Sequence, residues 1–194
     1  MLIANNKPIK IIGYAESSMT KEFYSAISKI KSVDIIYPAD FIQLADKTSY
    51  QYIISVSIDL DERKQLIKLV DTENLDLITF IHDTSLIDSN PVIKPGTFIF
   101  PFCNISIDST VGQHCIIGSY SLIGHSSHLG NNCILRPGVM ITGKSTVGNH
   151  CVINIRATIT NKVTIANDIE ILAFANVVKD IKYAGQYLTK SLKN

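Results

Sequence analysis

The chain of 194 residues has no tryptophan and no excess of either charge. Its 18 basic and 17 acidic residues give a formal net charge of +1, and no basic segment is interleaved with aromatic residues, which argues against nucleic acid as a partner. No apolar run approaches the roughly 20 residues of a membrane-spanning helix. The opening MLIANNKPIK also lacks the pattern of a secretory signal. We therefore expect a cytoplasmic protein without membrane insertion.

The four cysteines form neither a CxxC pair nor a metal-binding spacing. Cys115, Cys133 and Cys151 instead follow one another at equal intervals along the chain. We expect them to stack inside the fold as small buried side chains, about 4.8 Å apart. The sequence predicts no metal site.

An aliphatic residue stands at every sixth position from Ile81 to Val177, seventeen times without a break. Four positions after each comes a mostly small residue, such as Ser109 or Ser127, and glycine often follows the aliphatic residue directly. This hexapeptide pattern is typical of a parallel β-helix, in which three short strands form each coil, so that one coil spans three hexapeptides. Strand alternation or an amphipathic helix would not stay in phase over this length.

The first 80 residues have a different pattern, in which strands alternate with helices. The expected strands are 8–15, 33–37, 50–57 and 75–81, and the expected helices are 17–30 and 59–70. Ser17 or Ser18 is expected to cap the first helix, and Asp59 with Glu62 has the spacing of a capping box. The alternation predicts a small Rossmann-like α/β domain with a parallel sheet, and such sheets bind ligands at the carboxyl ends of their strands. A packing domain without a ligand remains the alternative.

Three segments carry a resemblance to a known family: KIIGYAESS after the first strand, TFIHDTSLI at the junction, and GHSSHLGNNCILRPGVMITGKSTVG in the coils. The chain resembles the nucleotide-sugar N-acetyltransferases of the hexapeptide family, which include the bacillosamine-pathway enzyme. The resemblance implies a left-handed coil, a homotrimer, and acetyl-CoA in a groove between subunits. We thus predict a nucleotide-sugar-binding α/β domain over residues 1–80. A left-handed parallel β-helix over 81–194, ending in a short tail, would bind acetyl-CoA and carry the catalytic residues.

By this resemblance His125 is the proton acceptor, and the backbone amide of Gly143 faces the thioester. Three hexapeptides separate the two residues, so they should lie next to each other on adjacent coils. Acyl transfer needs such neighbours, because the base and the oxyanion donor act on the same carbonyl group. The resemblance also assigns Ile134, Ile155 and Ala173 to acetyl-CoA, and Gly13, Ala15, Glu16, Ser17 and Asp40 to the nucleotide sugar.

The family carries an acidic residue after the catalytic histidine, where this chain has Ser126. Asp108 lies one coil length before Ser126, so it is predicted to stand beside it and to orient the His125 ring directly or through one water. An ordinary solvated turn residue is the alternative for Asp108. His128 has no family counterpart, and we expect it to have no catalytic role.

The implied reaction moves acetyl from acetyl-CoA to the amino group of a nucleotide-linked 4-amino-4,6-dideoxy sugar, for a bacterial surface glycan. A cysteine nucleophile is disfavoured because every cysteine falls on a core position of the repeat. Two alternatives stay open: an acyltransferase for another amine or a hydroxyl, and a non-catalytic protein that binds nucleotide sugars. Uridine, thymidine and guanosine carriers are not distinguished.

Overall fold

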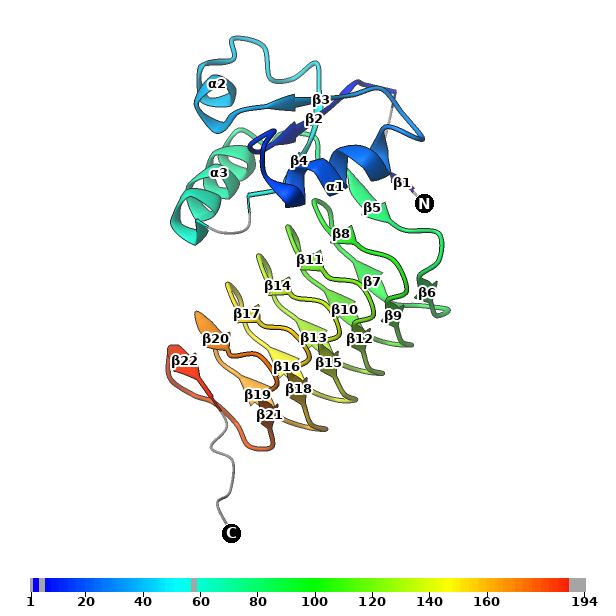
Figure 1. The fold of residues 1–194 in the computed structure, drawn as a ribbon, viewed down its shortest axis with the longest axis vertical. Coiled ribbons are helices and arrows are strands. Elements are labelled where there is room, and N and C mark those ends of the chain that lie inside the picture. Colours follow the sequence, from blue (N-terminus) through cyan, green and yellow to red (C-terminus); the bar gives the residue numbers. More distant parts are fainter. Residues whose placement is uncertain (1, 4–5, 57–58, 189–194) are drawn as a thin grey trace. The chain divides into compact units, whose positions relative to one another are not determined.

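A computed structural model of the chain describes residues 2–3, 6–56 and 59–188. The chain divides into two compact units, Met1–Phe80 and Ile81–Asn194. Helices gather in the first unit, whereas the second is a stack of short strands (Figure 1). The predicted fold class, a small α/β domain followed by a parallel β-helix of hexapeptide repeats, is confirmed.

The first unit is built on a three-stranded parallel sheet with the order β3-β2-β4. Its strands are β2 (Ile9–Ile12), β3 (Val33–Ile36) and β4 (Gln51–Ile54), and its helices are α1 (Ser18–Ile27), α2 (Pro38–Gln43) and α3 (Leu60–Thr72). Ile53 and Phe41 are fully buried in the core of this unit, as is the central strand residue Ile11. The sheet is parallel, as the alternation of strands and helices predicts.

Two local expectations in this unit were wrong in part. The predicted strand 75–81 is divided: Leu77 makes a single parallel bridge with Tyr52, whereas β5 (Thr79–Ile81) pairs antiparallel with β1 (Leu2–Ile3). Helix α2 was not predicted, because six residues are too few to show a helical period. Pro38 starts α2, where its missing N–H costs nothing.

The expected capping box of α3 is only half formed. The Asp59 side chain accepts from the Glu62 backbone N–H at 2.9 Å. The Glu62 carboxylate does not return the bond, because it accepts from the Tyr14 hydroxyl instead. At α1, Ser17 is the N-cap residue, and its hydroxyl makes no capping hydrogen bond.

The second unit winds through three sheets, which we number 1 to 3, and their strands pair in parallel apart from β1, which pairs antiparallel with β5 in sheet 1. Sheet 1 contains β5, β8 (Phe98–Ile99), β11 (Ile116–Ile117), β14 (Ile134–Leu135), β17 (Val152–Ile153), β20 (Ile169–Ile171) and β22 (Gly185–Tyr187). Sheet 2 contains β7 (Val92–Ile93), β10 (Thr110–Val111), β13 (His128–Leu129), β16 (Thr146–Val147) and β19 (Thr164–Ile165). Sheet 3 contains β6 (Leu86–Ile87), β9 (Asn104–Ile105), β12 (Leu122–Ile123), β15 (Met140–Ile141), β18 (Thr158–Ile159) and β21 (Asn176–Val177).

Successive coils are offset by three hexapeptides, as in the pairing of Thr110 with His128. The repeated aliphatic residues fill the interior: Ile123 and Ile141 are completely buried. Cys115 and Cys133 are buried there as well, and their thiols donate to the carbonyls of Gly130 and Gly148. These cysteines therefore pack as small core residues.

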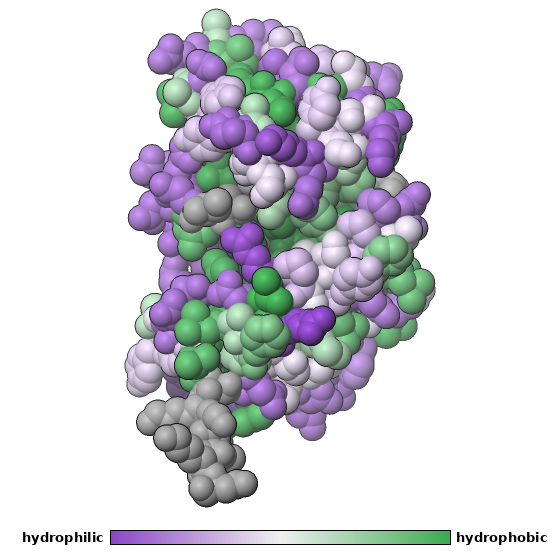
Figure 2. All heavy atoms as spheres, viewed as in Figure 1, coloured by the Kyte–Doolittle hydropathy of each residue, from purple (hydrophilic) through white to green (hydrophobic). Residues whose placement is uncertain are grey.

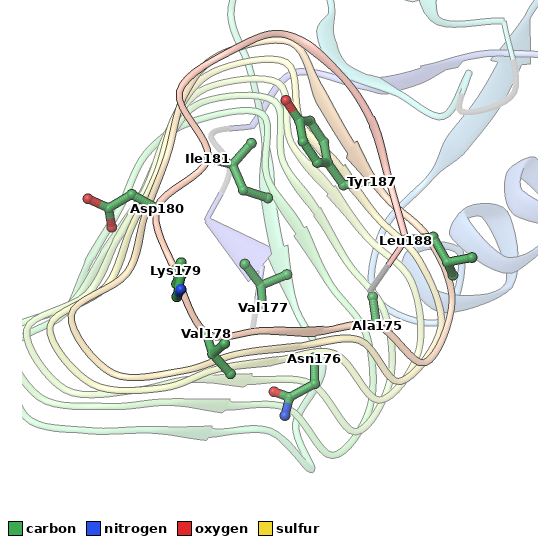
Figure 3. A pocket seen from close by; sticks show the side chains of 9 residues that line it. All are labelled: Ala175, Asn176, Val177, Val178, Lys179, Asp180, Ile181, Tyr187 and Leu188. Atoms are coloured by element: carbon green, nitrogen blue, oxygen red, sulfur yellow. The ribbon is translucent and has the colours of Figure 1, made fainter. Parts of the chain in front are cut away.

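The last coil is shorter than the others. Ile181 forms a bridge with Ile165, where a coil of full length would have brought Tyr183. The interior remains open beyond this bridge as a cavity of about 220 Å³. Val177 and Tyr187 point into this opening (Figure 3). The cavity is lined by the last described coil and continues the core, so we assign it to the fold and not to a ligand.

The corners between sheets use left-handed backbone at one fixed position. At the corner between sheets 3 and 2, which we call the His125 corner, the residues in this position are Asp108, Ser126, Lys144 and Lys162, with φ between 56° and 63°. Each corner is tied to the coil before it, as where Lys144 N–H donates to the His125 carbonyl at 2.9 Å. Residues one coil apart therefore stand beside each other in a column.

Candidate active site

The His125 side chain lies directly over Gly143. A Cβ added to Gly143 would fall 2.7 Å from the imidazole Cδ2 and 2.9 Å from Cε1, with Nε2 closer still. Any side chain at residue 143 would displace the ring. The two residues are thus direct neighbours, and the exposed His125 imidazole covers the buried Gly143.

Backbone N–H groups at several corner positions donate to side-chain oxygens on neighbouring coils. At the same column position one coil before His125, Ile107 N–H donates to the Asp88 carboxylate at 3.0 Å. At another corner, Asn131 N–H and Asn149 N–H donate to the side-chain oxygens of Asn149 and Asn167. Among the described residues, no such oxygen accepts from Gly143 N–H. The role of this N–H as an oxyanion donor stays a prediction.

His125 is exposed, and its ring contacts the side chain that follows it. The Ser126 hydroxyl lies 3.5 Å from Nδ1, a long hydrogen bond. When Nδ1 carries the proton and donates to Ser126, Nε2 is the basic nitrogen, and Nε2 is the atom directed over Gly143. The serine adds no charge beside the ring, and its role in orienting His125 stays a prediction.

Asp108 stands in the Ser126 column, as the spacing predicts. The Asp108 carboxylate, however, accepts a hydrogen bond at 2.9 Å from the side chain of Asn90, on the coil before. The role of Asp108 in orienting His125 stays a prediction. His128 is exposed on β13, where it pairs with Thr110 and Thr146 in sheet 2.

Of the residues assigned to acetyl-CoA, Gly143 lies beside His125, whereas Ile155 and Ala173 lie elsewhere on the same chain. Ile155 and Ala173 share a column at the corner between sheets 1 and 3, which we call the Ile155 corner. Ile155 is 46% exposed, whereas Ile134, on the outer face of β14 in sheet 1, is only 1% exposed. Sheet 3 separates the Ile155 corner from the His125 corner.

The residues assigned to the nucleotide sugar follow the first two strands of the α/β unit. Gly13, Ala15, Glu16 and Ser17 connect β2 to α1, and Asp40 is exposed in the first turn of α2. Gly13 is required by close approach: a Cβ there would collide with the Ser55 hydroxyl and would lie 2.6 Å from Oγ1 of Thr20. This glycine therefore brings the loop tightly against β4.

Two tyrosines that the sequence analysis passed over complete this edge of the sheet. The rings of Tyr14 and Tyr37 meet edge to face with centroids 5.9 Å apart. Tyr14 donates to Glu62 at 2.7 Å and Tyr37 donates to Glu16 at 3.1 Å, and these hydrogen bonds raise the pKa of both phenols. Their positions just after β2 and β3 were the signal that could have identified them.

Within residues 2–3, 6–56 and 59–188, no three His, Cys, Asp or Glu side chains are grouped so as to hold a metal ion. The helices in that part of the chain are too short or too polar to cross a membrane. Burial raises the pKa of the Cys103 thiol to about 11, so this cysteine stays protonated near neutral pH.

A family model described as bacterial transferase hexapeptide (six repeats) matches residues 108–143, the segment that contains both His125 and Gly143. No match was found among curated proteins. Solved structures, in contrast, match along nearly the whole chain.

PerB from Caulobacter crescentus, in complex with CoA and GDP-perosamine, has a TM-score of 0.83 at 19% identity, over 95% of each chain. The acetyltransferase domain of PglB from Neisseria gonorrhoeae has a TM-score of 0.84 at 16% identity, over 93% of this chain and 96% of that one. The same domain with acetyl coenzyme A has a TM-score of 0.80 at 16% identity, over 91% and 93%. The chain is thus structurally similar, at low identity, to the nucleotide-sugar N-acetyltransferases suggested by its sequence, and what it shares with them is the fold.

Proposed function

We propose that the protein transfers acetyl from acetyl-CoA to the amino group of a nucleotide-linked 4-amino-4,6-dideoxy sugar. The observation that carries the proposal is the His125 imidazole above Gly143, whose N–H lacks, among the described residues, the side-chain acceptor found at equivalent corner positions. A base and an oxyanion donor at one point are what acyl transfer requires. The likeness to PerB with its CoA and GDP-perosamine supports the substrate classes.

In this mechanism the amine nitrogen attacks the thioester carbonyl carbon, and Nε2 of His125 takes the proton that the amine loses. The carbonyl oxygen becomes an oxyanion and accepts from Gly143 N–H. When the tetrahedral intermediate collapses, the carbon–sulfur bond breaks and the leaving thiolate receives the proton from the imidazolium. No covalent acyl-enzyme forms, in keeping with cysteines that lie in the core.

The placement of the residues favours a site built by two chains in a homotrimer. His125 and Ile155 lie at different corners of one solenoid, and a ligand bound between two copies can contact His125 of one and Ile155 of the other. The Ile155 corner exposes large apolar side chains: Phe102, Tyr120, Ile155 and Phe174. On the face shown in Figure 2, apolar side chains reach the surface among polar ones. An exposed apolar row is typical of an interface.

The nucleotide part is proposed to bind at the edge of the α/β sheet, with Gly13, Ala15, Glu16, Ser17 and Asp40. Tyr14 and Tyr37 support this, because they add aromatic surface beside these residues. An acyltransferase for a different amine or hydroxyl acceptor would use the same solenoid site. A non-catalytic protein would need neither His125 nor Gly143.

The test is thiol release from acetyl-CoA with a panel of UDP-, dTDP- and GDP-linked amino sugars. We expect His125→Ala to lower kcat about 100-fold or more, in the range of general-base catalysis, while its matched control His128→Ala stays close to wild type. Silence of the wild-type protein with every acceptor, together with no thermal shift from acetyl-CoA, would favour the non-catalytic alternative. Equal losses in both variants would remove His125 from the mechanism.

A further inference from the structure

Arg136 is a charged residue close in sequence to Ile134, which the resemblance assigns to acetyl-CoA. It directly follows β14, two residues after Ile134, and so continues the outer face of sheet 1. Ile134 is almost completely buried, whereas Arg136 is half-buried. A ligand at this part of the solenoid therefore meets the guanidinium and not the isoleucine.

The Arg136 column holds a glycine on one neighbouring coil and an asparagine on the other. On the coil before it lies Gly118, whose N–H donates to Leu135, and a Cβ there would fall 2.8 Å from the Arg136 carbonyl carbon. On the coil after it lies Asn154. The column is thus empty of side chain on one side and polar on the other.

The surroundings of Arg136 act on its charge in two opposite directions. Burial lowers the pKa of its guanidinium, and the negative charge of Glu170 raises it. The two carboxylate oxygens of Glu170 also accept from Asn154 at 3.0 Å and from Gln186 at 2.9 Å. An anion that approaches the guanidinium would offset its partial desolvation, and the planar set of guanidinium donors matches phosphate.

Arg136 lies at nearly the same position along the solenoid axis as the proposed reacting centre, which is formed by His125 and Gly143. It lies in sequence between His125 and Gly143, so it stands within about one coil, roughly 5 Å, of both along the axis. Within one chain sheet 3 separates them. In a trimer whose threefold axis is parallel to the solenoid axis, however, the symmetry keeps each residue at the same position along the axis. Arg136 of one chain can then face His125 of a neighbouring chain.

We propose that Arg136 binds the diphosphate of the acceptor nucleotide sugar in the active site whose His125 belongs to the neighbouring subunit. This rests on the proposed function. Both substrates carry a diphosphate, but in a 4-amino sugar nucleotide only the sugar ring separates it from the reacting amine. In acetyl-CoA the whole pantetheine arm lies between the thioester and the diphosphate. A cation within one coil of the reacting carbonyl therefore fits the acceptor.

The first experiment measures Michaelis constants for Arg136→Gln, Arg136→Lys and the control Lys94→Gln, which removes a charge at a different corner of the solenoid. Arg136→Gln should raise KM for the nucleotide sugar about 10- to 100-fold, as for loss of a charged hydrogen-bonded contact, with KM for acetyl-CoA unchanged. Arg136→Lys should recover part of the loss. With the free amino sugar, which lacks the diphosphate, Arg136→Gln and wild type should react equally.

The second experiment tests which chain supplies the arginine. His125→Ala and Arg136→Gln chains with different tags are co-expressed, and mixed trimers are purified through both tags. If the site joins His125 of one chain to Arg136 of another, mixed trimers contain intact sites and show the wild-type KM. A site within one chain would leave every site defective, and the mixture would keep the high KM of Arg136→Gln.

The outcomes distinguish the proposal for Arg136 from the proposed acetyltransferase function. A wild-type protein that neither releases thiol nor binds any nucleotide sugar by calorimetry overturns the proposed function. An active wild type with an unchanged KM in Arg136→Gln overturns the arginine proposal alone. A change in KM for acetyl-CoA in place of the nucleotide sugar would assign Arg136 to the donor diphosphate and overturn the proposal as well.

Discussion

The solenoid and the α/β unit place their functional residues by different means. In the solenoid a backbone ladder with a fixed offset of three hexapeptides sets the neighbours, so Gly143 lies beside His125 as subtraction predicts. In the α/β unit individual side chains decide the contacts, as where Ser55 and Thr20 close against Gly13 and hydrogen-bond to each other at 2.8 Å. In a repeat, the residues that become neighbours can be calculated from the sequence, whereas the neighbours at the edge of the α/β sheet are known only from the structure.

The largest expected effect concerns the solenoid core. Ile141→Ala removes a completely buried side chain, and we expect a loss of about 2–5 kcal/mol in the free energy of unfolding, measured by denaturant titration. Its neighbour Met140 is 42% exposed, and Met140→Ala should cost much less. Comparable losses in the two variants would mean that the ladder, and not the packed interior, dominates the stability of the solenoid.

The next effect concerns the geometry of the site. Gly143→Ala places a methyl group where the His125 ring lies, so the ring must move, and kcat should fall about 100-fold. Thr146→Ala, on an exposed position of the same coil, should leave kcat near the wild-type value. Circular dichroism should show both variants folded. Full activity of Gly143→Ala would show that the ring is free to leave this position without consequence.

A smaller effect is expected in the α/β unit, where a single side chain starts α3. Asp59→Ala removes the acceptor for Glu62 N–H, and the unfolding free energy should fall by about 1 kcal/mol. Asp71→Ala, within the last turn of the same helix, is the control because it removes a like charge without touching this cap. If Asp59→Ala is neutral, the Glu62–Tyr14 hydrogen bond is enough to hold the start of α3.

The smallest effect is a pH dependence in the same unit. Burial raises the pKa of Tyr52 from 10.0 to about 12. A raised folded pKa gives stability that is complete below pH 10 and is lost as the pH rises towards 12. Tyr52→Phe should therefore lose less stability than wild type between pH 10 and 12, measured by urea denaturation at each pH. Parallel curves for the two proteins would contradict this.

Much of the fold was predictable, and the exceptions have physical causes. Strand 75–81 was predicted as one element because most of its residues are apolar, but Leu77 and β5 pair with different strands. The Asp59–Glu62 box was predicted from spacing, but the Tyr14 phenol competes for the Glu62 carboxylate. Both failures come from partners distant in sequence, which local patterns do not contain.

The sequence by itself determined the hexapeptide phase, and with it the solenoid, its buried cysteines and the column that joins His125 to Gly143. These follow because each coil repeats the same backbone hydrogen bonds, so position in the repeat fixes position in space. The tertiary structure alone decided that the imidazole covers the Gly143 peptide, that Asp108 binds Asn90, and that Arg136 is half-buried beside a glycine. Side-chain direction and burial depend on packing among residues from different coils, and no repeat period specifies them.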